Sequence, residues 1–373
     1  MPKRHLLIVL IVLSCLLFSQ DEFYPIDKLS KNLENAGENE IAILNVLESI
    51  GNPELRDAYS FLLAYMPAID IVALEPNKYL EEVEVALFTR NSLPWGKDCP
   101  KEIFYNYVLP HRNSQEPLEY WRCFLLEQLS PAIDTVDNAY DAAIAINYWC
   151  GERVDFQQTQ RQDQGVFETL KSGYGRCEEM AIMYVCACRA CGIPARSAWT
   201  PYWTHSDNNH AWVEVYVNGK WHYTGGCEPK PKLNDAWFNK SVKHAPVVLT
   251  TCYGKPLIKD NVYKEKENWA IIYSTSNYGL NPGKIHIQTP EESLSVAISV
   301  YNWGAFRSIL RQYTDEEGKA TFEMNEGQYF ISAGDSMVFD DAIVDVKSGQ
   351  NSEVELKPEK IKYVKKSFDL KYR

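Results

Sequence analysis

The chain has 373 residues and a net charge of −12, so it is too long for one average domain and too acidic for a typical nucleic-acid binder. Hydrophobic residues make up 45% of the chain and charged residues 24%, a balance that permits a packed core and argues against disorder. These numbers exclude classes of protein but indicate no function.

The first residues, 1–20, predict an export signal. A Lys-Arg pair precedes the apolar run 6–13, which is too short to span a bilayer stably. Cys15 follows a small residue, as in a bacterial lipoprotein cleavage site, so we expect either lipidation of Cys15 or ordinary cleavage near Ser19. In both cases the protein is expected to be exported, as a cell-envelope lipoprotein or a secreted protein. Membrane contact is expected only through a lipid on Cys15.

The ten cysteines allow several interpretations. An exported protein can form disulfides, but their pairing does not follow from the sequence. Cys186, Cys188 and Cys191 have a spacing that resembles a metal site. On a helix, however, Cys186 and Cys188 point ~200° apart and cannot both face one ion. We therefore interpret these cysteines as buried, and we expect no metal and no organic cofactor.

The N-terminal region, 21–96, is predicted to be helical. Ile41, Leu44 and Leu47 recur at helical spacing, and a second such series follows at 80–87. No chemistry is visible in this region.

The middle region, 97–255, is predicted to contain helices followed by strands. Residues 134–150 have the pattern of an amphipathic helix, and 177–191 that of a buried helix. Residues 211–217 alternate like a strand, and 220–224 return as a second strand. The intervening Asn-Gly pair is a strong hairpin signal.

The C-terminal region, 280–360, is predicted to be a small all-β sandwich. Candidate strands are 294–301, 319–323, 328–333 and 342–346, separated by Gly-containing turns.

Two segments of this region, 314–322 and 326–331, resemble carboxypeptidase-regulatory or prealbumin-like β-domains. The resemblance implies an accessory module.

The residues that indicate chemistry lie between Gly173 and Glu228. A glycine-bearing loop delivers Cys177 to the start of the predicted helix, where backbone N–H groups and the helix dipole favour a thiolate. The same N–H groups can face an oxyanion that forms beside the sulfur. His210, at the entrance of the predicted strand, can supply the base. A Cys at a helix N-terminus facing a His on a strand is a papain-like arrangement.

The motifs around these residues resemble the transglutaminase-like superfamily over 130–230. They are Gly-Tyr-Gly-Arg-Cys-Glu-Glu from Gly173, Cys-Arg-Ala-Cys-Gly-Ile-Pro-Ala-Arg from Cys188, His-Ala-Trp-Val-Glu-Val-Tyr from His210, and Gly-Lys-Trp-His from Gly219.

Within these motifs, Gly-Arg-Cys-Glu-Glu and the segment ending at Glu228 are most similar to the peptide N-glycanase branch. The resemblance implies an α+β fold with a papain-like core, preceded by the helical region and followed by the β-sandwich. It implies Cys177 as nucleophile, His210 as general base, and attack on an amide or related acyl carbon through a thioester.

One position departs from the family pattern. An acidic residue, usually Asp, normally follows the second-strand Trp by four positions and orients the His, but this chain has Gly225 there. Loss of such a residue can cost about 10⁴ in rate when nothing replaces it. Glu228 is a candidate substitute, with a substrate contact or a structural role as alternatives. Asp207 and Asn208 are further candidates.

The remaining candidates carry weaker signals. His205 and His222 are alternative bases, and Gln164 is a candidate for the oxyanion hole. Several aromatic residues line the cleft or belong to the core: Trp199, Tyr202, Trp203 and Trp212.

Two functions follow from these observations. The first is an exported transglutaminase-like cysteine hydrolase that acts on an amide bond of a peptide or glycopeptide, with water as acceptor. The second is a catalytically weak or inactive surface protein that binds a glycan or peptide, which Gly225 and the appended β-domain favour. In either case the expected partner is a peptide or glycopeptide and not a nucleic acid.

Overall fold

The structure is a computed structural model that describes residues 23–159 and 163–360. The predicted export signal and Cys15 lie outside the described residues. Within these two ranges, each helix is too short or too polar to span a membrane.

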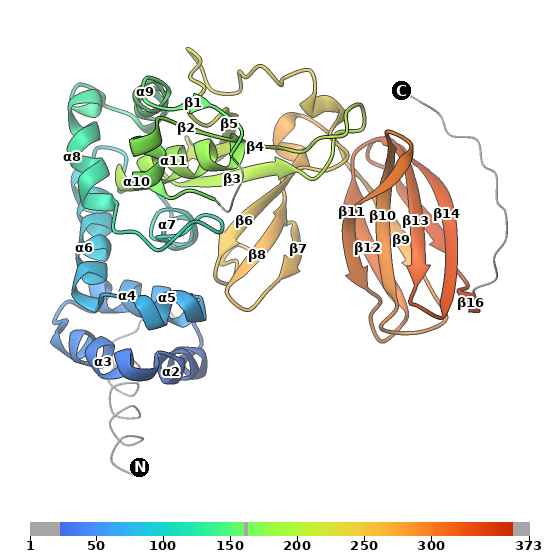
Figure 1. The fold of residues 1–373 in the computed structure, drawn as a ribbon, viewed down its shortest axis with the longest axis horizontal. Helices are drawn as coiled ribbons and strands as arrows, with labels where there is room; N and C mark the ends of the chain where they lie inside the picture. The colour runs from blue at the N-terminus through green and yellow to red at the C-terminus, as the bar shows by residue number, and fades with distance from the viewer. Residues whose placement is uncertain (1–22, 160–162, 361–373) are drawn as a thin grey trace, which may run out of the picture. The chain divides into compact units, whose positions relative to one another are not determined.

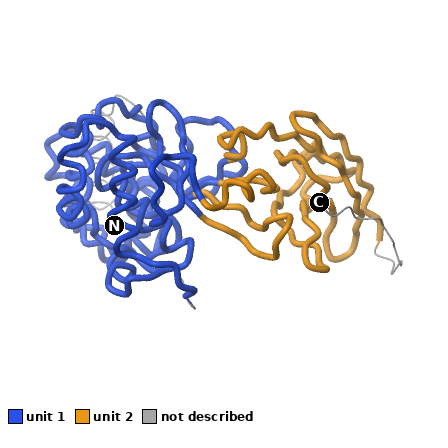
Figure 2. The backbone as a smooth tube through the Cα atoms, turned by 90° about the horizontal axis from the view of Figure 1, so that it is seen from above, with its two compact units in different colours: residues 1–197, 212–236, 250–272 blue, residues 198–211, 237–249, 273–373 orange. Residues whose placement is uncertain are grey.

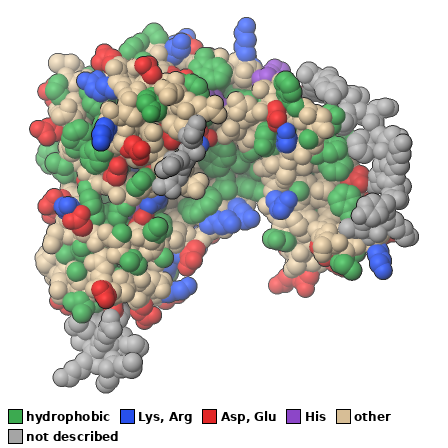
Figure 3. Space-filling view, viewed as in Figure 1, with side chains coloured by type: hydrophobic (Ala, Val, Ile, Leu, Met, Phe, Trp, Pro, Cys, Tyr) green, Lys and Arg blue, Asp and Glu red, His purple; other side chains and the backbone are tan. Residues whose placement is uncertain are grey.

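The chain divides into two compact units (Figure 2). The first unit contains the described residues of 1–197 together with 212–236 and 250–272. The second unit contains 198–211, 237–249 and the described residues of 273–373. On the face drawn in Figure 3, acidic and basic side chains are interspersed.

The first unit begins with short helices, as the sequence predicts (Figure 1). They are α2 (Ile26–Asn35), η1 (Gly37–Asn39), α3 (Glu40–Ser49), α4 (Pro53–Tyr65), α5 (Ala68–Ala73), α6 (Pro76–Ser92) and α7 (Lys101–Tyr107). Leu44 and Leu47 face the hydrophobic core, whereas Ile41 is 62% exposed. The helical spacing is therefore confirmed, although one of its three apolar residues lies on the outer face.

Four further helices follow, the last of which begins with the predicted nucleophile: α8 (Arg122–Ile133), α9 (Ala139–Gly151), α10 (Val166–Ser172) and α11 (Cys177–Ala190). Helix α11 contacts α8, α9 and α10, and every residue from Glu179 onward is buried. The predicted helix at 134–150 begins later, at Ala139. The Asn138 side chain accepts a hydrogen bond from the Asp141 N–H and caps the helix there.

A six-stranded sheet has the order β5-β4-β3-β6-β8-β7. Its strands are β3 (Ala195–Thr200), β4 (His210–Val217), β5 (Lys220–Thr224), β6 (Leu249–Tyr253), β7 (Val262–Glu265) and β8 (Trp269–Tyr273). The predicted hairpin is confirmed as β4 and β5, paired antiparallel up to Val217 and Lys220. Asn218 and Gly219 both have positive φ, as a tight type I′ turn requires.

A buried ion pair connects three strands of this sheet. Arg196 on β3 donates to Glu214 on β4 through Nε and Nη2, at 2.9 and 2.7 Å. The guanidinium lies 3.8 Å from the ring centroid of Trp221 on β5. These three residues belong to the motifs identified in the sequence, and their role in the structure is to fix β3, β4 and β5 against one another.

Two buried arginines hold the segment before α8. Arg122 donates to the carbonyl oxygens of Val108 and Leu109, and Arg189 on α11 donates to those of Tyr107 and Pro110. Burial lowers the pKa of Arg189 to about 10. Because their guanidinium donors satisfy carbonyl groups that form no regular structure, the two arginines define the path of this segment.

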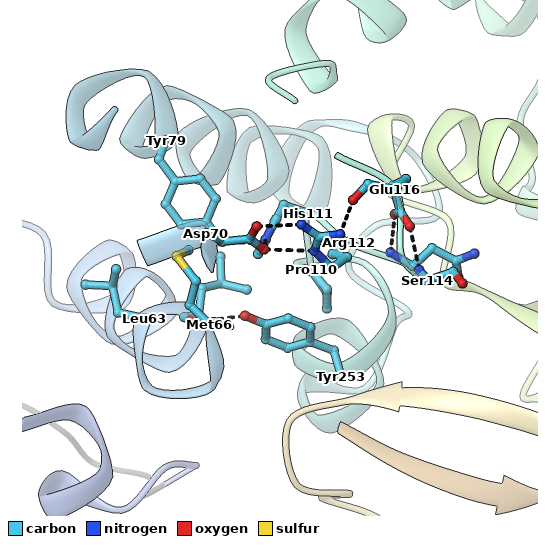
Figure 4. A network of polar contacts seen from close by, with 12 residues as sticks. Leu63, Met66, Asp70, Tyr79, Pro110, His111, Arg112, Ser114, Glu116 and Tyr253 are labelled. Atoms are coloured by element: carbon cyan, nitrogen blue, oxygen red, sulfur yellow. Dashed lines mark hydrogen bonds and ion pairs between the residues drawn. The ribbon is translucent and has the colours of Figure 1, made fainter. Parts of the chain in front are cut away.

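The same segment continues into a polar network that reaches the N-terminal helices (Figure 4). Asp70 on α5 contacts His111 Nε2 at 3.2 Å and accepts from Arg112 Nε at 2.8 Å. Tyr79 Oη lies 2.7 Å from His111 Nδ1. These contacts fit a neutral imidazole that donates from Nε2 to the carboxylate and accepts the Tyr79 proton at Nδ1.

The second unit contains two sheets, with strand orders β11-β10-β13-β14-β16 and β12-β9-β15. Their strands are β9 (Gly283–Gln288), β10 (Ser295–Asn302), β11 (Ala305–Tyr313), β12 (Lys319–Met324), β13 (Gly327–Gly334), β14 (Val338–Val346), β15 (Asn351–Glu355) and β16 (Glu359–Lys360). Burial alternates along β12 and β13, as in sheets that share a core.

The four predicted strands correspond to β10, β12, β13 and β14. Strand β14 begins at Val338 rather than at residue 342. The predicted start was too late because two aspartates, Asp340 and Asp341, interrupt the apolar pattern of the strand. Strands β9, β11, β15 and β16 were not predicted from the sequence.

We predict that Arg196→Met destabilises the first unit by about 3–5 kcal/mol, because it leaves the Glu214 carboxylate buried without its partner. Chemical denaturation at pH 7 measures this loss. The double variant R196M/E214L removes both charges and should recover most of it. If R196M lowers the unfolding free energy by less than about 1 kcal/mol, as expected for an exposed ion pair, the Arg196–Glu214 pair is not the buried, stabilising pair described above.

The Asp70–His111 contact predicts an acid-sensitive stability. Burial lowers the pKa of His111 below its ordinary value of 6.5, against the opposing effect of Asp70. For Asp70, hydrogen bonds from His111 and Arg112 outweigh burial and lower the carboxyl pKa to about 2. The neutral imidazole and the ionised carboxylate are therefore both favoured by folding. Their contribution to stability is present at neutral pH and decreases as pH falls below 6.5, and again below 3.8.

The variant H111Q should therefore lose less unfolding free energy between pH 6.5 and 5 than the unmodified protein. Replacement of the half-buried His286 by Gln is the control and should keep the original slope. Equal slopes in all three proteins would contradict the predicted titration of His111.

Candidate active site

Cys177 is the first residue of α11 and is partly exposed. The turn before it is fixed by Glu179, whose buried carboxylate accepts a hydrogen bond from the Arg176 N–H at 2.8 Å. The same carboxylate accepts from Thr159 Oγ1 at 2.9 and 3.0 Å and from the Gln164 N–H at 3.3 Å. One carboxylate thus holds three chain segments around the first turn of α11, which fixes the backbone that presents the sulfur.

A charged side chain, that of Glu178, contacts the Cys177 sulfur. The Cys177 Sγ lies 3.1 Å from Glu178 Oε2 and donates to that carboxylate. Arg176 Nε lies 3.8 Å from the same oxygen, and Arg176 Nη2 is 2.6 Å from Asp163 Oδ1. The arginine therefore offsets part of the negative charge that Glu178 places beside the thiol.

The segment that carries Glu228 packs against the first turn of α11. A Cβ atom at Gly226 would lie 2.7 Å from the Met180 carbonyl oxygen and 2.8 Å from the Ala181 Cα, so only glycine fits this close approach. Cys227 Sγ lies 3.3 Å from the same carbonyl oxygen. Within the first unit, the segment preceding Glu228 is thus fixed one turn along the helix that begins with Cys177.

The carboxyl group of Glu228 fills the space beside Gly225. A Cβ atom at Gly225 would lie 3.1 Å from Glu228 Cδ and directly against Oε2. Residues 225 and 228 form an isolated antiparallel bridge, and the Glu228 N–H lies 3.4 Å from the Gly225 carbonyl oxygen. Asn147 on α9 donates to the same carbonyl at 2.9 Å. The Glu228 carboxyl group therefore lies against the backbone of Gly225, and its role as a substitute for the family's acidic residue stays a prediction.

His210 is the first residue of β4 and is 8% exposed. Within the second unit its ring lies 4.8 Å from Trp237, 5.1 Å from Phe238 and 6.2 Å from Trp203, between ring centroids. Trp237 is itself 59% exposed. The imidazole therefore has aromatic neighbours, one of which is open to solvent.

Cys177 and Glu228 belong to the first unit and His210 to the second, so the pairing of sulfur with imidazole stays a prediction. Trp237 and Phe238 were not identified from the sequence. They lie 27 and 28 residues after His210, outside the quoted motifs, and no spacing rule links them to it.

The alternative bases occupy other environments. His205 lies 5.7 Å from Trp203 and 6.4 Å from His244, between ring centroids. Burial, and secondarily His244, lowers the pKa of His205. His222 on β5 contacts the Asn234 side chain through Nδ1 at 2.9 Å, and burial lowers its pKa.

Three other predicted candidates, Gln164, Asp207 and Trp212, have the following contacts or burial. The Gln164 side-chain oxygen accepts from Thr169 Oγ1 at 3.3 Å, and the Asp207 carboxylate accepts from Arg307 at 2.9 and 2.8 Å. Trp212 is fully buried.

The cysteines are thiols throughout the described residues. Cys186, Cys188 and Cys191 are fully buried, which confirms that part of the prediction. Over 23–159 and 163–360 no cluster of three or more His, Cys, Asp or Glu side chains is arranged to hold a metal ion.

Residues 127–224 match the model of the Transglutaminase-like superfamily. This segment is about a quarter of the chain and includes both Cys177 and His210. The core is transglutaminase-like. The whole chain accordingly has an α+β fold in which this core follows N-terminal helices and precedes C-terminal sheets.

Among solved structures, the chain is similar to three distant proteins. A "putative cysteine protease" from Cytophaga hutchinsonii shares 17% identity at a TM-score of 0.29, over 48% of this chain and 65% of that chain. Red sea bream transglutaminase shares 10% identity at a TM-score of 0.32, over 68% and 66% of the two chains. The TIE protein of Bacillus anthracis shares 10% identity at a TM-score of 0.19, over 45% and 31%.

This chain spans less than two thirds of each of these proteins, and no curated protein matches it. At these identities and TM-scores, the three structures do not carry an activity over to this chain.

We predict that Glu178→Gln makes Cys177 react faster with iodoacetamide at pH 6–7, because it removes a negative charge 3.1 Å from the sulfur. Mass spectrometry of the alkylated peptide measures the rate. The exposed Glu168 on α10 provides the matched control, E168Q, which should change nothing. A slower reaction in E178Q would instead identify Glu178 as a group that accepts the thiol proton.

Proposed function

We propose that the protein is a cysteine hydrolase in which Cys177 is the nucleophile, His210 the general base and Glu228 the carboxylate that orients the imidazole. The observation that carries this proposal is the Glu228 carboxyl group lying in the space beside Gly225. The superfamily match over both Cys177 and His210 supports it.

In the proposed reaction His210 takes the proton of Cys177, and the sulfur attacks the carbonyl carbon of an amide. The C–N bond breaks, the amine leaves with the proton from the imidazolium, and a thioester remains on Cys177. Water then attacks the thioester with His210 again accepting a proton, which releases the acid and restores the thiol. Backbone N–H groups of the first turn of α11 are suited to stabilise the oxyanion in both steps.

The substrate we propose is an exposed peptide or glycopeptide, met outside the cell by an exported protein. The solvent-exposed ring of Trp237 beside His210 supplies an apolar surface against which a peptide side chain or a sugar ring can pack. The same surface suits the alternative function, a binding protein without turnover, and the reactivity of Cys177 distinguishes the two.

The decisive experiment is the rate of Cys177 alkylation as a function of pH in the mature protein. We expect Cys177 to react well below pH 7, since a His-paired thiol at a helix start has a pKa of roughly 3.5–7.5. The variant H210A should abolish this reactivity, and E228Q should reduce it. The exposed Cys123 serves as an internal reference thiol.

The matched control for H210A is H286A, since His286 lies on β9 and its ring contacts Thr321 on the neighbouring strand. If Cys177 titrates like Cys123 and neither H210A nor E228Q changes its rate, the hydrolase proposal is wrong and the binding function takes its place.

A further inference from the structure

We propose that the C-terminal sheets position the general base, with Asn302 and Arg307 as positioning residues for His210. The effect on catalysis rests on the proposed function, in which His210 is the base. The contacts from which we argue all lie within the second unit.

The loop 201–209 leads directly into His210 and contains no helix or strand. Within it, the Trp203 N–H donates to the Asn208 carbonyl at 2.9 Å, and the Asn208 N–H donates to the Ser206 carbonyl at 2.8 Å. Such a segment needs external contacts to hold one conformation.

Asn302, at the end of β10, supplies these contacts. Its side-chain amide is buried and donates to the Trp203 carbonyl at 2.7 Å and to the Ser206 carbonyl at 2.6 Å. Both amide hydrogens are thereby used on the loop. Replacing Asn302 by an apolar residue would leave two carbonyl groups without these donors.

Arg307 on β11 makes the second contact. Its Nε and Nη2 donate to the two oxygens of Asp207, at 2.9 and 2.8 Å, which is a bidentate ion pair three residues before His210. About a third of each side chain is exposed, so the pair contributes orientation more than stability.

A third contact holds the segment that follows Trp237 and Phe238. Asn325, which follows β12, donates its side-chain amide to the carbonyls of Lys243 and Ala245 at 3.1 and 3.0 Å. This segment connects back to Phe238 through the Val242 N–H, at 2.9 Å. The two loops also meet directly, where Thr204 Oγ1 donates to the His244 carbonyl at 2.9 Å.

The aromatic residues beside His210 therefore sit on two loops that the sheets hold in place. Trp203 belongs to the loop bound by Asn302, and Trp237 and Phe238 precede the segment bound by Asn325. Since these rings pack on the imidazole, a shift of either loop changes the orientation of the base. The C-terminal sheets are in this sense part of the catalytic scaffold, in addition to any accessory role.

The test compares N302A and R307Q with N351A, a matched control at an exposed position of β15 in the same sheets. Two quantities are measured on the full mature chain: the NMR titration of the His210 ring, and the alkylation rate of Cys177 against pH. We expect N302A to shift the His210 resonances and their titration midpoint and to lower Cys177 reactivity below pH 7 by about tenfold to a hundredfold. R307Q should act in the same direction with a smaller effect, and N351A should have none.

Unchanged His210 resonances in a folded N302A protein would overturn the positioning role. If N302A does not fold, R307Q decides alone, because it removes only a partly exposed pair. Failure of the proposed function gives a different result. In that case N302A still shifts the His210 resonances, but H210A leaves the alkylation rate of Cys177 unchanged.

Discussion

The geometry of the candidate site depends on one buried carboxylate, that of Glu179. It accepts hydrogen bonds from Arg176, from Thr159 and from Gln164, and so determines where the chain enters α11. A nucleophile at a helix start benefits from the dipole only if the preceding backbone is held in an extended conformation that leaves the N–H groups pointing at the reacting atom. The second glutamate of the Cys-Glu-Glu motif therefore serves the backbone, whereas the first, Glu178, acts on the sulfur directly.

Two arginines of the motifs also have structural roles. Arg189 and Arg196 belong to one of the motifs quoted from the sequence, and both are buried and make contacts within the first unit. One holds carbonyl groups of an irregular segment, and the other pairs with Glu214 across the sheet. A buried charge that loses its partner costs several kcal/mol, so such residues are constrained as strongly as catalytic ones. Motif membership alone does not separate the two roles.

At the position where the family pattern has an acidic residue, this chain has a glycine with a carboxyl group beside it. Gly225 has no side chain, and the Glu228 carboxyl group lies against the place where its Cβ would be. The bridge between residues 225 and 228 and the positive φ of Cys227 fold the chain back on itself. The longer glutamate side chain then brings its carboxyl group beside the Gly225 backbone, a contact that the spacing of the two residues alone does not specify.

The sequence by itself determined the elements whose signals are local: the start of α11 at Cys177, the β4–β5 hairpin at its Asn-Gly turn, and four of the eight described strands of the C-terminal sheets. These follow from periodicity and turn chemistry within a few residues. Only the tertiary structure decided that Glu228 fills the space at Gly225 and that Asn302 holds the loop before His210. Such contacts depend on how distant segments pack, and a residue's neighbours in space are not encoded in the spacing of its own motif.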